Sequence, residues 1–333
     1  MVFFTGHTAL QYWHRFLRLY GDRRNGNGPL PPFADFHRLP LETPRSKEAL
    51  LESQAFCDSY PIEVMAPDRN HKCKSSLVAN RIRDCEFPSR SFCRLSEGIH
   101  VVGVELLFLE LAPEFDLVAL AFLGCELASA YTYMEDIFEE GVDASGLKSC
   151  APLTSRRSLL EYLDRCEGRH CIAKARLAAS FVLDDAYSPM EICVGLLLTL
   201  PRRYGGFGLP KPDLNQEVEV DSEKGQGFRK RSIRFDMLWR KGRVALEYDS
   251  DSFHGSMDDL HDDSMRRNVA RAMRFDVVTI TSAEYQDVRC LERVARSIAK
   301  GIGHQMRPFG IGDLARISRT RDSLDSMRAK RLM

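Results

Sequence analysis

The stretch that decides the fold of this chain is residues 233–249, which read Ile233-Arg234-Phe235-Asp236-Met237-Leu238-Trp239, Arg240-Lys241-Gly242-Arg243 and Val244-Ala245-Leu246-Glu247-Tyr248-Asp249. The first and last segments alternate large apolar residues with polar ones, as half-buried strands do. The four residues between them suit a two-residue hairpin turn, because Gly242 can adopt the positive φ that such turns require. The stretch therefore predicts a β-hairpin.

This hairpin sets a register that brings two acidic residues together. If Arg240 faces Arg243, counting back along both strands places Asp236 directly opposite Glu247. Directly opposed residues have Cβ atoms about 4.5–5.5 Å apart, and like charges there destabilise a sheet. A divalent cation held by oxygen ligands would offset that repulsion. We therefore interpret Asp236 and Glu247 as a candidate metal site, and two solvated acids on an exposed sheet face are the alternative.

The residues on either side of the hairpin predict an α+β domain. Ser188 as N-cap, Pro189 in the first turn and Glu191 three residues after the cap predict a helix that ends before Pro201. The remaining elements are expected at residues 217–220 (strand), 260–274 (helix), 277–281 (a β-branched strand) and 288–298 (amphipathic helix). The predicted order is helix, three strands, helix, strand, helix.

The first half of the chain shows mainly helical patterns. Apolar residues keep helical spacing between Thr8 and Tyr20 and again at 104–112 and 117–131, whereas 100–103 suggests one short strand. An acidic, glycine-containing segment at 134–141 indicates a domain boundary near residue 150. We therefore expect a mainly helical recognition or partner domain at 1–150 and a second domain at 151–333.

Composition sets limits on the class of protein. The chain has 333 residues, of which 44% are hydrophobic and 28% charged, which is typical of a soluble globular protein of two domains. The formal net charge is zero, so global charge gives no argument for nucleic acid. Ten cysteines without a CxxC pair, and no visible signal peptide, predict reduced thiols in the cytoplasm. Five acidic residues interrupt the apolar region 99–133, which argues against a membrane span.

Several elements of the second half together resemble the PD-(D/E)xK nuclease superfamily, specifically its branch similar to very-short-patch-repair endonucleases. The matching residues are Ser188-Pro189-Met190-Glu191, Arg234-Phe235-Asp236, Leu246-Glu247-Tyr248-Asp249, Phe253-His254-Gly255, Asp263-x-x-Arg266-Arg267-Asn268 and Val277-Val278-Thr279-Ile280-Thr281. The resemblance covers residues 186–303 and implies a restriction-endonuclease-like core. The N-terminal half is more faintly similar to the winged-helix domains of bacterial abortive-infection and antitoxin proteins.

The resemblance implies roles for particular residues. Asp236, Glu247 and the backbone carbonyl of Tyr248 would hold Mg²⁺ or Mn²⁺, with Glu191 nearby, and His254 would orient or deprotonate the attacking water. The expected catalytic residues are thus Asp236, Glu247, Asp249, His254 and Glu191. The expected nucleic-acid contacts are Arg234, Lys230, Arg231, Arg266, Arg267 and Arg271.

The chain departs from the superfamily pattern at one position. Asp249 stands where the pattern has a lysine, two residues after the second acid. The predicted register sets Arg234 against Asp249, so a cross-strand ion pair would explain the acid. Lys241, Arg234 or Arg266 could supply the cationic role instead. Glu191 also has a structural explanation, as the capping-box partner of Ser188.

These observations lead to three functional hypotheses. The first is a cytoplasmic, metal-dependent endonuclease of bacterial defence that hydrolyses phosphodiester bonds of DNA, with a possible protein partner on its N-terminal domain. The second is a nuclease fold without turnover that serves as a DNA-binding regulator or antitoxin-like component. The third is a hydrolase of another phosphate ester. Loss of metal-dependent plasmid nicking on Asp236→Ala would separate the first from the second.

Overall fold

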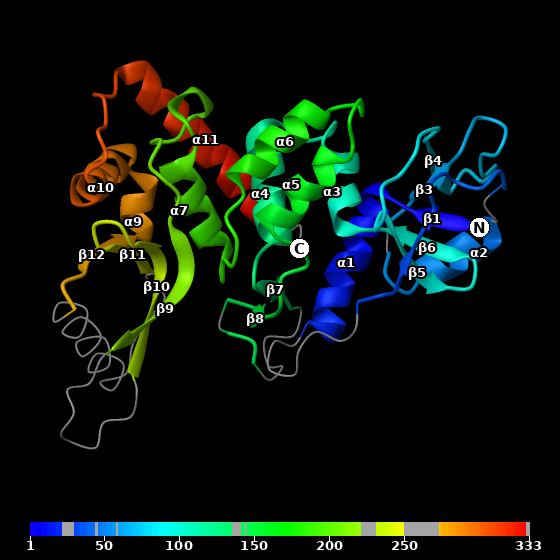
Figure 1. Ribbon diagram of the computed structural model, residues 1–333, viewed down its shortest axis with the longest axis horizontal. Coiled ribbons are helices and arrows are strands. Elements are labelled where there is room, and N and C mark those ends of the chain that lie inside the picture. The colour runs from blue at the N-terminus through cyan, green and yellow to red at the C-terminus, as the bar shows by residue number, and fades with distance from the viewer. Residues whose placement is uncertain are drawn as a thin grey trace. The chain divides into compact units, whose positions relative to one another are not determined.

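The computed structural model describes residues 1–21, 30–43, 46–57, 59–134, 141–143, 145–220, 231–249 and 273–330. The chain forms two compact units: unit 1 comprises Met1–Val182 with Lys330–Met333, and unit 2 comprises Leu183–Ala329 (Figure 1). The boundary thus lies after Val182 and not near residue 150. The reason is that helices α5 (Arg156–Asp164) and α6 (Ile172–Phe181) pack against α3 (Val104–Leu111) and α4 (Leu117–Leu127) of the first unit.

Within its described residues, unit 1 contains a six-stranded mixed sheet, so the mainly helical expectation is wrong. The strands are β1 (Val2–Phe4), β2 (Phe33–Ala34), β3 (Ile62–Ala66), β4 (Val78–Ile82), β5 (Phe92–Ser96) and β6 (Ile99–Val102). Their order is β2-β5-β6-β1-β3-β4, with β1 parallel to β6 and antiparallel to β3. Strands of two to five residues are too short for alternation to reveal them.

Helices α1 (Gly6–Tyr20), α3 and α4 form where apolar spacing predicts them, although α4 ends at Leu127 and Tyr131 lies in a strand. The remaining elements are α2 (Ser46–Ser53) and a hairpin of β7 (Tyr131–Tyr133) and β8 (Leu147–Ser149). Helix α4 begins where Asp116 caps it, because the side chain accepts a hydrogen bond from Ala119 N at 2.8 Å. Among the described residues, no helix combines the length and the apolar character that crossing a bilayer requires. None of the ten cysteines, all of which lie within the described residues, forms a disulfide.

Unit 2 has the four strands that the sequence predicts, in the predicted order along the chain. Its sheet runs β12-β11-β10-β9, formed by β9 (Asp213–Val220), β10 (Arg231–Trp239), β11 (Val244–Asp249) and β12 (Asp276–Thr281). Strand β10 is antiparallel to both of its neighbours, β9 and β11, and β12 is parallel to β11. The described helices are α7 (Pro189–Thr199), the 3-10 turn Arg202–Tyr204, α9 (Ser282–Gln286), α10 (Val288–Gly301) and α11 (Ile311–Lys330). The fold is therefore α+β, while the helix predicted at 260–274 falls almost entirely outside the described residues.

The hairpin of β10 and β11 has the predicted register. Met237 pairs with Leu246 and Trp239 with Val244, and Arg243 N donates a hydrogen bond to Arg240 O at 3.3 Å across the turn. Gly242 has φ 100°, which only glycine adopts readily. A Cβ there would lie 2.5 Å from the carbonyl oxygen at the C-terminal end of α10. The turn is thus fixed both by its own backbone and by its packing on α10.

Candidate active site around Asp236

The centre of the candidate site is an irregularity in β10 at Asp236. In the ladder with β9, Phe235 pairs with Gln216 and Met237 with Leu214, but no pair is formed between them, at Asp236 and Asn215. Asn215 has φ 51°, in the left-handed region. Phe235 also shares a hydrophobic cluster with Leu238, three residues on, which strict alternation would place on the opposite face. The alternation predicted from the sequence therefore stops at Asp236.

This irregularity directs the Asp236 carboxylate toward β11. Its Oδ2 accepts a hydrogen bond from the backbone N–H of Tyr248 at 2.8 Å. Tyr248 directly follows Glu247 in β11, so Asp236 is held against β11 beside that acid. Irregular strand residues near active sites commonly re-aim a side chain in this way. The described pairs of the hairpin end at Met237 and Leu246, so the direct pairing of Asp236 with Glu247 stays a prediction.

Tyr248 joins this region to the start of helix α9. Its hydroxyl shares a hydrogen bond of 2.9 Å with Ser282 Oγ, at the start of α9. In an extended strand the N–H and the carbonyl of one residue point to the same side, because an antiparallel pair exchanges both bonds. Since the N–H of Tyr248 points to Asp236, its carbonyl also lies on the β10 side. That is where the resemblance requires a carbonyl ligand.

Glu191 is the most buried acid of the site, with 6% of its surface exposed. Its carboxylate accepts hydrogen bonds from Tyr187 N at 2.9 Å, Ser188 Oγ at 2.9 Å and Asn215 Nδ2 at 2.5 Å. In return, Ser188 Oγ accepts from Glu191 N at 3.2 Å. The N-cap role of Ser188 is therefore confirmed, whereas Glu191 accepts bonds from Tyr187 N and Ser188 Oγ in place of the Ser188 N of a capping box. Glu191 also ties the start of α7 to β9.

The charge state of Glu191 depends on Asp236. Burial raises the pKa of Glu191 to about 7, the negative charge of Asp236 adds to the rise, and its hydrogen-bond donors oppose it. Glu191 therefore lies close to Asp236, as the sequence predicts, and holds a proton at higher pH than an ordinary glutamate does.

Asn215 belongs to the site although the sequence analysis did not select it. Its amide donates both to Glu191 and, at 2.9 Å, to the carbonyl of Asp185. Asparagine adopts the left-handed region more readily than most residues, which suits it to the break in β9. Asn215 lies outside the strand predicted at 217–220 and enters β9 only because that strand begins earlier, at Asp213, so no pattern in the sequence indicated this position.

The cationic candidates lie at different distances from the acids. The Arg234 guanidinium lies 4.6 Å from the ring centroid of Tyr187, whose backbone N–H binds Glu191, so this cation is near the start of α7. Lys241 belongs to the hairpin turn, and at about 3.3 Å per strand residue it is roughly 15 Å from Glu247. Of these two side chains, Arg234 is therefore the better candidate for the cationic role of the lysine that Asp249 replaces.

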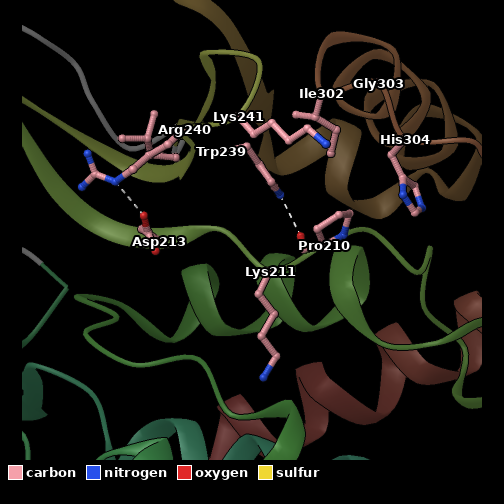
Figure 2. Close-up of a pocket in the computed structure, with 10 residues that line it drawn as sticks. Pro210, Lys211, Asp213, Trp239, Arg240, Lys241, Ile302, Gly303 and His304 are labelled. Atoms are coloured by element: carbon pink, nitrogen blue, oxygen red, sulfur yellow. Dashed lines mark hydrogen bonds and ion pairs between the residues drawn. The ribbon is translucent and has the colours of Figure 1, made fainter.

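Lys241 instead lines a separate cavity of about 200 Å³ at the turn end of the sheet (Figure 2). Figure 2 shows its side chain extending from the turn toward Ile302, at the C-terminal end of α10. A cation is favoured there by the helix dipole. Trp239 Nε1 donates to Pro210 O at 2.7 Å beside the same cavity, which fixes the wall. This cavity has a structural explanation and lies apart from Asp236.

The other sequence-predicted residues are only partly described. Asp249 is exposed at the end of β11, where it pairs with Thr281 of β12. Arg234 faces Glu217 in the β9–β10 register, and its predicted ion pair with Asp249 stays a prediction. His254, Lys230, Arg266, Arg267 and Arg271, and the side chain of Arg231, lie outside the described residues.

The donor set of this site suits a hard divalent cation. In the part of the chain that the structure describes, no three His, Cys, Asp or Glu side chains are grouped as metal ligands. Mg²⁺ usually takes only one or two carboxylates and completes its shell with waters and substrate phosphates. The Asp236 carboxylate retains acceptor capacity beside its bond to Tyr248 N. Asp236, Glu247 and the Tyr248 carbonyl therefore fit Mg²⁺ by their chemistry.

No family model matches the chain, and no curated protein or solved structure is significantly similar to it.

Proposed function

We propose that unit 2 is a restriction-endonuclease-like core that hydrolyses phosphodiester bonds of DNA with the help of Mg²⁺ or Mn²⁺. The order of elements supports this proposal, because a helix, three strands and a later fourth strand of the same sheet are among the elements that the resemblance implies. The observation that carries it is the Asp236 carboxylate, which is turned out of the strand pattern and held by Tyr248 N beside Glu247.

The residues of the chain would divide the chemistry between them. A bound cation would polarise the phosphate and lower the pKa of a coordinated water. Asp236, Glu247 and the carbonyl of Tyr248 would hold that cation. Arg234, near the start of α7, would offset the negative charge that develops on the phosphate.

Glu191 would act as a positioning residue and not as a metal ligand. Both of its carboxylate oxygens already accept hydrogen bonds from Tyr187, Ser188 and Asn215. These bonds hold the break in β9 against the helix start, and so fix the backbone opposite Asp236. Its role is to keep the shape of the site.

Plasmid cleavage and metal binding test the proposal. The wild type is expected to nick supercoiled DNA in Mg²⁺ or Mn²⁺, and Asp236→Asn to lower the rate by at least about 100-fold, because a ligand to the cation is weakened. Asp213→Asn is the matched control, since Asp213 lies on the same sheet but pairs with Arg240 at 2.9 Å. Calorimetric titration with Mn²⁺ should show binding to the wild type and to the control only. Undiminished cleavage by Asp236→Asn would contradict the assignment.

One observation favours a second candidate, a DNA-binding regulator without turnover. Asp249 is an exposed acid at the position of the pattern's lysine, so the phosphate would meet a negative charge there. This candidate predicts that the wild type binds DNA but cuts it in neither metal. Asp249→Lys would then be expected to introduce cleavage, whereas it would not raise the rate of an enzyme that already uses Arg234.

A further inference from the structure

A pocket of about 390 Å³ on unit 1 combines aromatic walls with arginines. It lies between α1, α2 and β5, and its lining residues are Tyr12, Arg15, Phe16, Leu19, Tyr20, Pro31, Glu52, Ala55, Phe56, Arg94 and Leu95. We call it the aromatic–arginine pocket. Its volume is in the range of sites that take small planar ligands. It belongs wholly to unit 1 and shares no residue with the site around Asp236.

The walls of the pocket present several aromatic ring faces and edges. The ring of Tyr12 meets that of Phe56 edge-on at 5.2 Å between centroids, and Phe16 lies 5.3 Å from Tyr20. Tyr20 is 54% exposed and Leu19 61% exposed, so both side chains are accessible at the rim of the pocket. Planar bases stack on such exposed rings.

The charges of the pocket select an anionic ligand. Arg15 and Arg94 both line it, and in the described part of the chain neither guanidinium has a hydrogen bond or an ion pair. Glu52 is the one acid among the lining residues, all of which are described. Guanidinium groups bind phosphate through paired N–H donors, so two without carboxylate partners favour a phosphate beside the rings.

We propose that the aromatic–arginine pocket binds an unstacked nucleotide of single-stranded nucleic acid. The rings would stack on the base, while Arg15 and Arg94 would contact the backbone phosphates. A strand is favoured over a free nucleotide because the rim residues Leu19 and Tyr20 are more than half exposed. Sites for free small ligands usually bury 70–90% of the ligand, whereas single-strand binders use open stacking platforms. This inference does not require unit 2 to be a nuclease.

Fluorescence anisotropy with a labelled single-stranded oligothymidylate tests this proposal. The full chain is used in EDTA, so that cleavage cannot occur. Tyr20→Ala is expected to weaken binding roughly 5- to 100-fold, because one stacking surface is lost. The double variant Arg15→Gln/Arg94→Gln should also weaken binding, and should reduce the slope of log affinity against log salt by about 1.4, since two phosphate contacts disappear.

The controls separate this inference from the proposed nuclease. Arg157→Gln removes one charge from an exposed arginine of unit 1 that pairs with Glu161 outside the pocket, and should bind like the wild type. Asp236→Asn should also bind normally, so a failure of either proposal leaves the other measurable. Wild-type affinity in both pocket variants would overturn the proposal. Equal affinity for a duplex would overturn the unstacked base, and equal affinity for free thymidine monophosphate would overturn the strand.

Discussion

Replacing Glu191 by Gln should change the pH dependence of folding in a direction that the structure fixes. Glutamine resembles the protonated carboxyl group: its oxygen can accept from Tyr187 N and Asn215 Nδ2, and its amide can donate to Ser188 Oγ. The variant therefore keeps the hydrogen bonds but cannot acquire the negative charge. It isolates the cost of ionising a buried carboxyl group beside Asp236.

The sign and size follow from the pKa of Glu191, which rises from its ordinary value of 4.5 to about 7 in the folded protein. Between these values the folded state binds more protons than the unfolded state, so stability is highest at low pH and falls as pH rises through about 7. From about pH 5 to pH 8 this group should cost the wild type roughly 2–3 kcal/mol. For a unit of this size that is roughly 5–10 °C in Tm.

Thermal unfolding in EDTA, followed by circular dichroism across this pH range, measures the difference. The Glu191→Gln curve should be flatter than the wild-type curve by roughly 2–3 kcal/mol. Glu126→Gln is the control for a buried acid elsewhere, because burial in unit 1 raises the pKa of Glu126 to about 8 and its slope should extend to higher pH. Parallel curves for the wild type and Glu191→Gln would refute the electrostatic description of the site.

Two further variants test the backbone of unit 2. In urea unfolding, Asn215→Ala should destabilise the fold by about 1 kcal/mol more than Asn215→Gly. Both variants lose the bond to Glu191, but only alanine is strained by the left-handed backbone at this position. Equal losses of stability would contradict that strain. Gly242→Ala should lower the free energy of unfolding by about 1–3 kcal/mol more than Gly303→Ala does. Both glycines have positive φ, but only at Gly242 would a Cβ meet the Gly301 carbonyl. Equal stabilities of the two variants would contradict the close contact between the turn and α10.

Much of unit 2 could be predicted from the sequence because its signals are local. The hairpin register follows from apolar alternation and from a glycine in the turn, and the start of α7 follows from Ser188, Pro189 and Glu191 within one helical turn. The β-branched run of β12 is equally local. Each of these elements is specified by residues only a few positions apart.

The sheet of unit 1 could not be predicted in this way. Its strand β1 has only three residues, and its parallel partner begins at Ile99, which pairs with Val2. No local pattern carries such a long-range pairing, and short strands are stabilised mainly by the neighbours on which they pack. The domain boundary lies after Val182, and not near residue 150 as predicted, for the same reason: only packing shows that α5 and α6 belong to unit 1.

The sequence by itself determined the register of the hairpin from Met237 to Leu246, because apolar alternation with a defined turn leaves one pairing of its strands. Only the tertiary structure decided how Asp236 is used. The Asp236 carboxylate turns to Tyr248 N at the point where the ladder with β9 is interrupted, opposite Asn215. Glu191 lies near Asp236 because α7 packs on β10. These contacts join three segments of the chain, and their energies exist only once those segments meet.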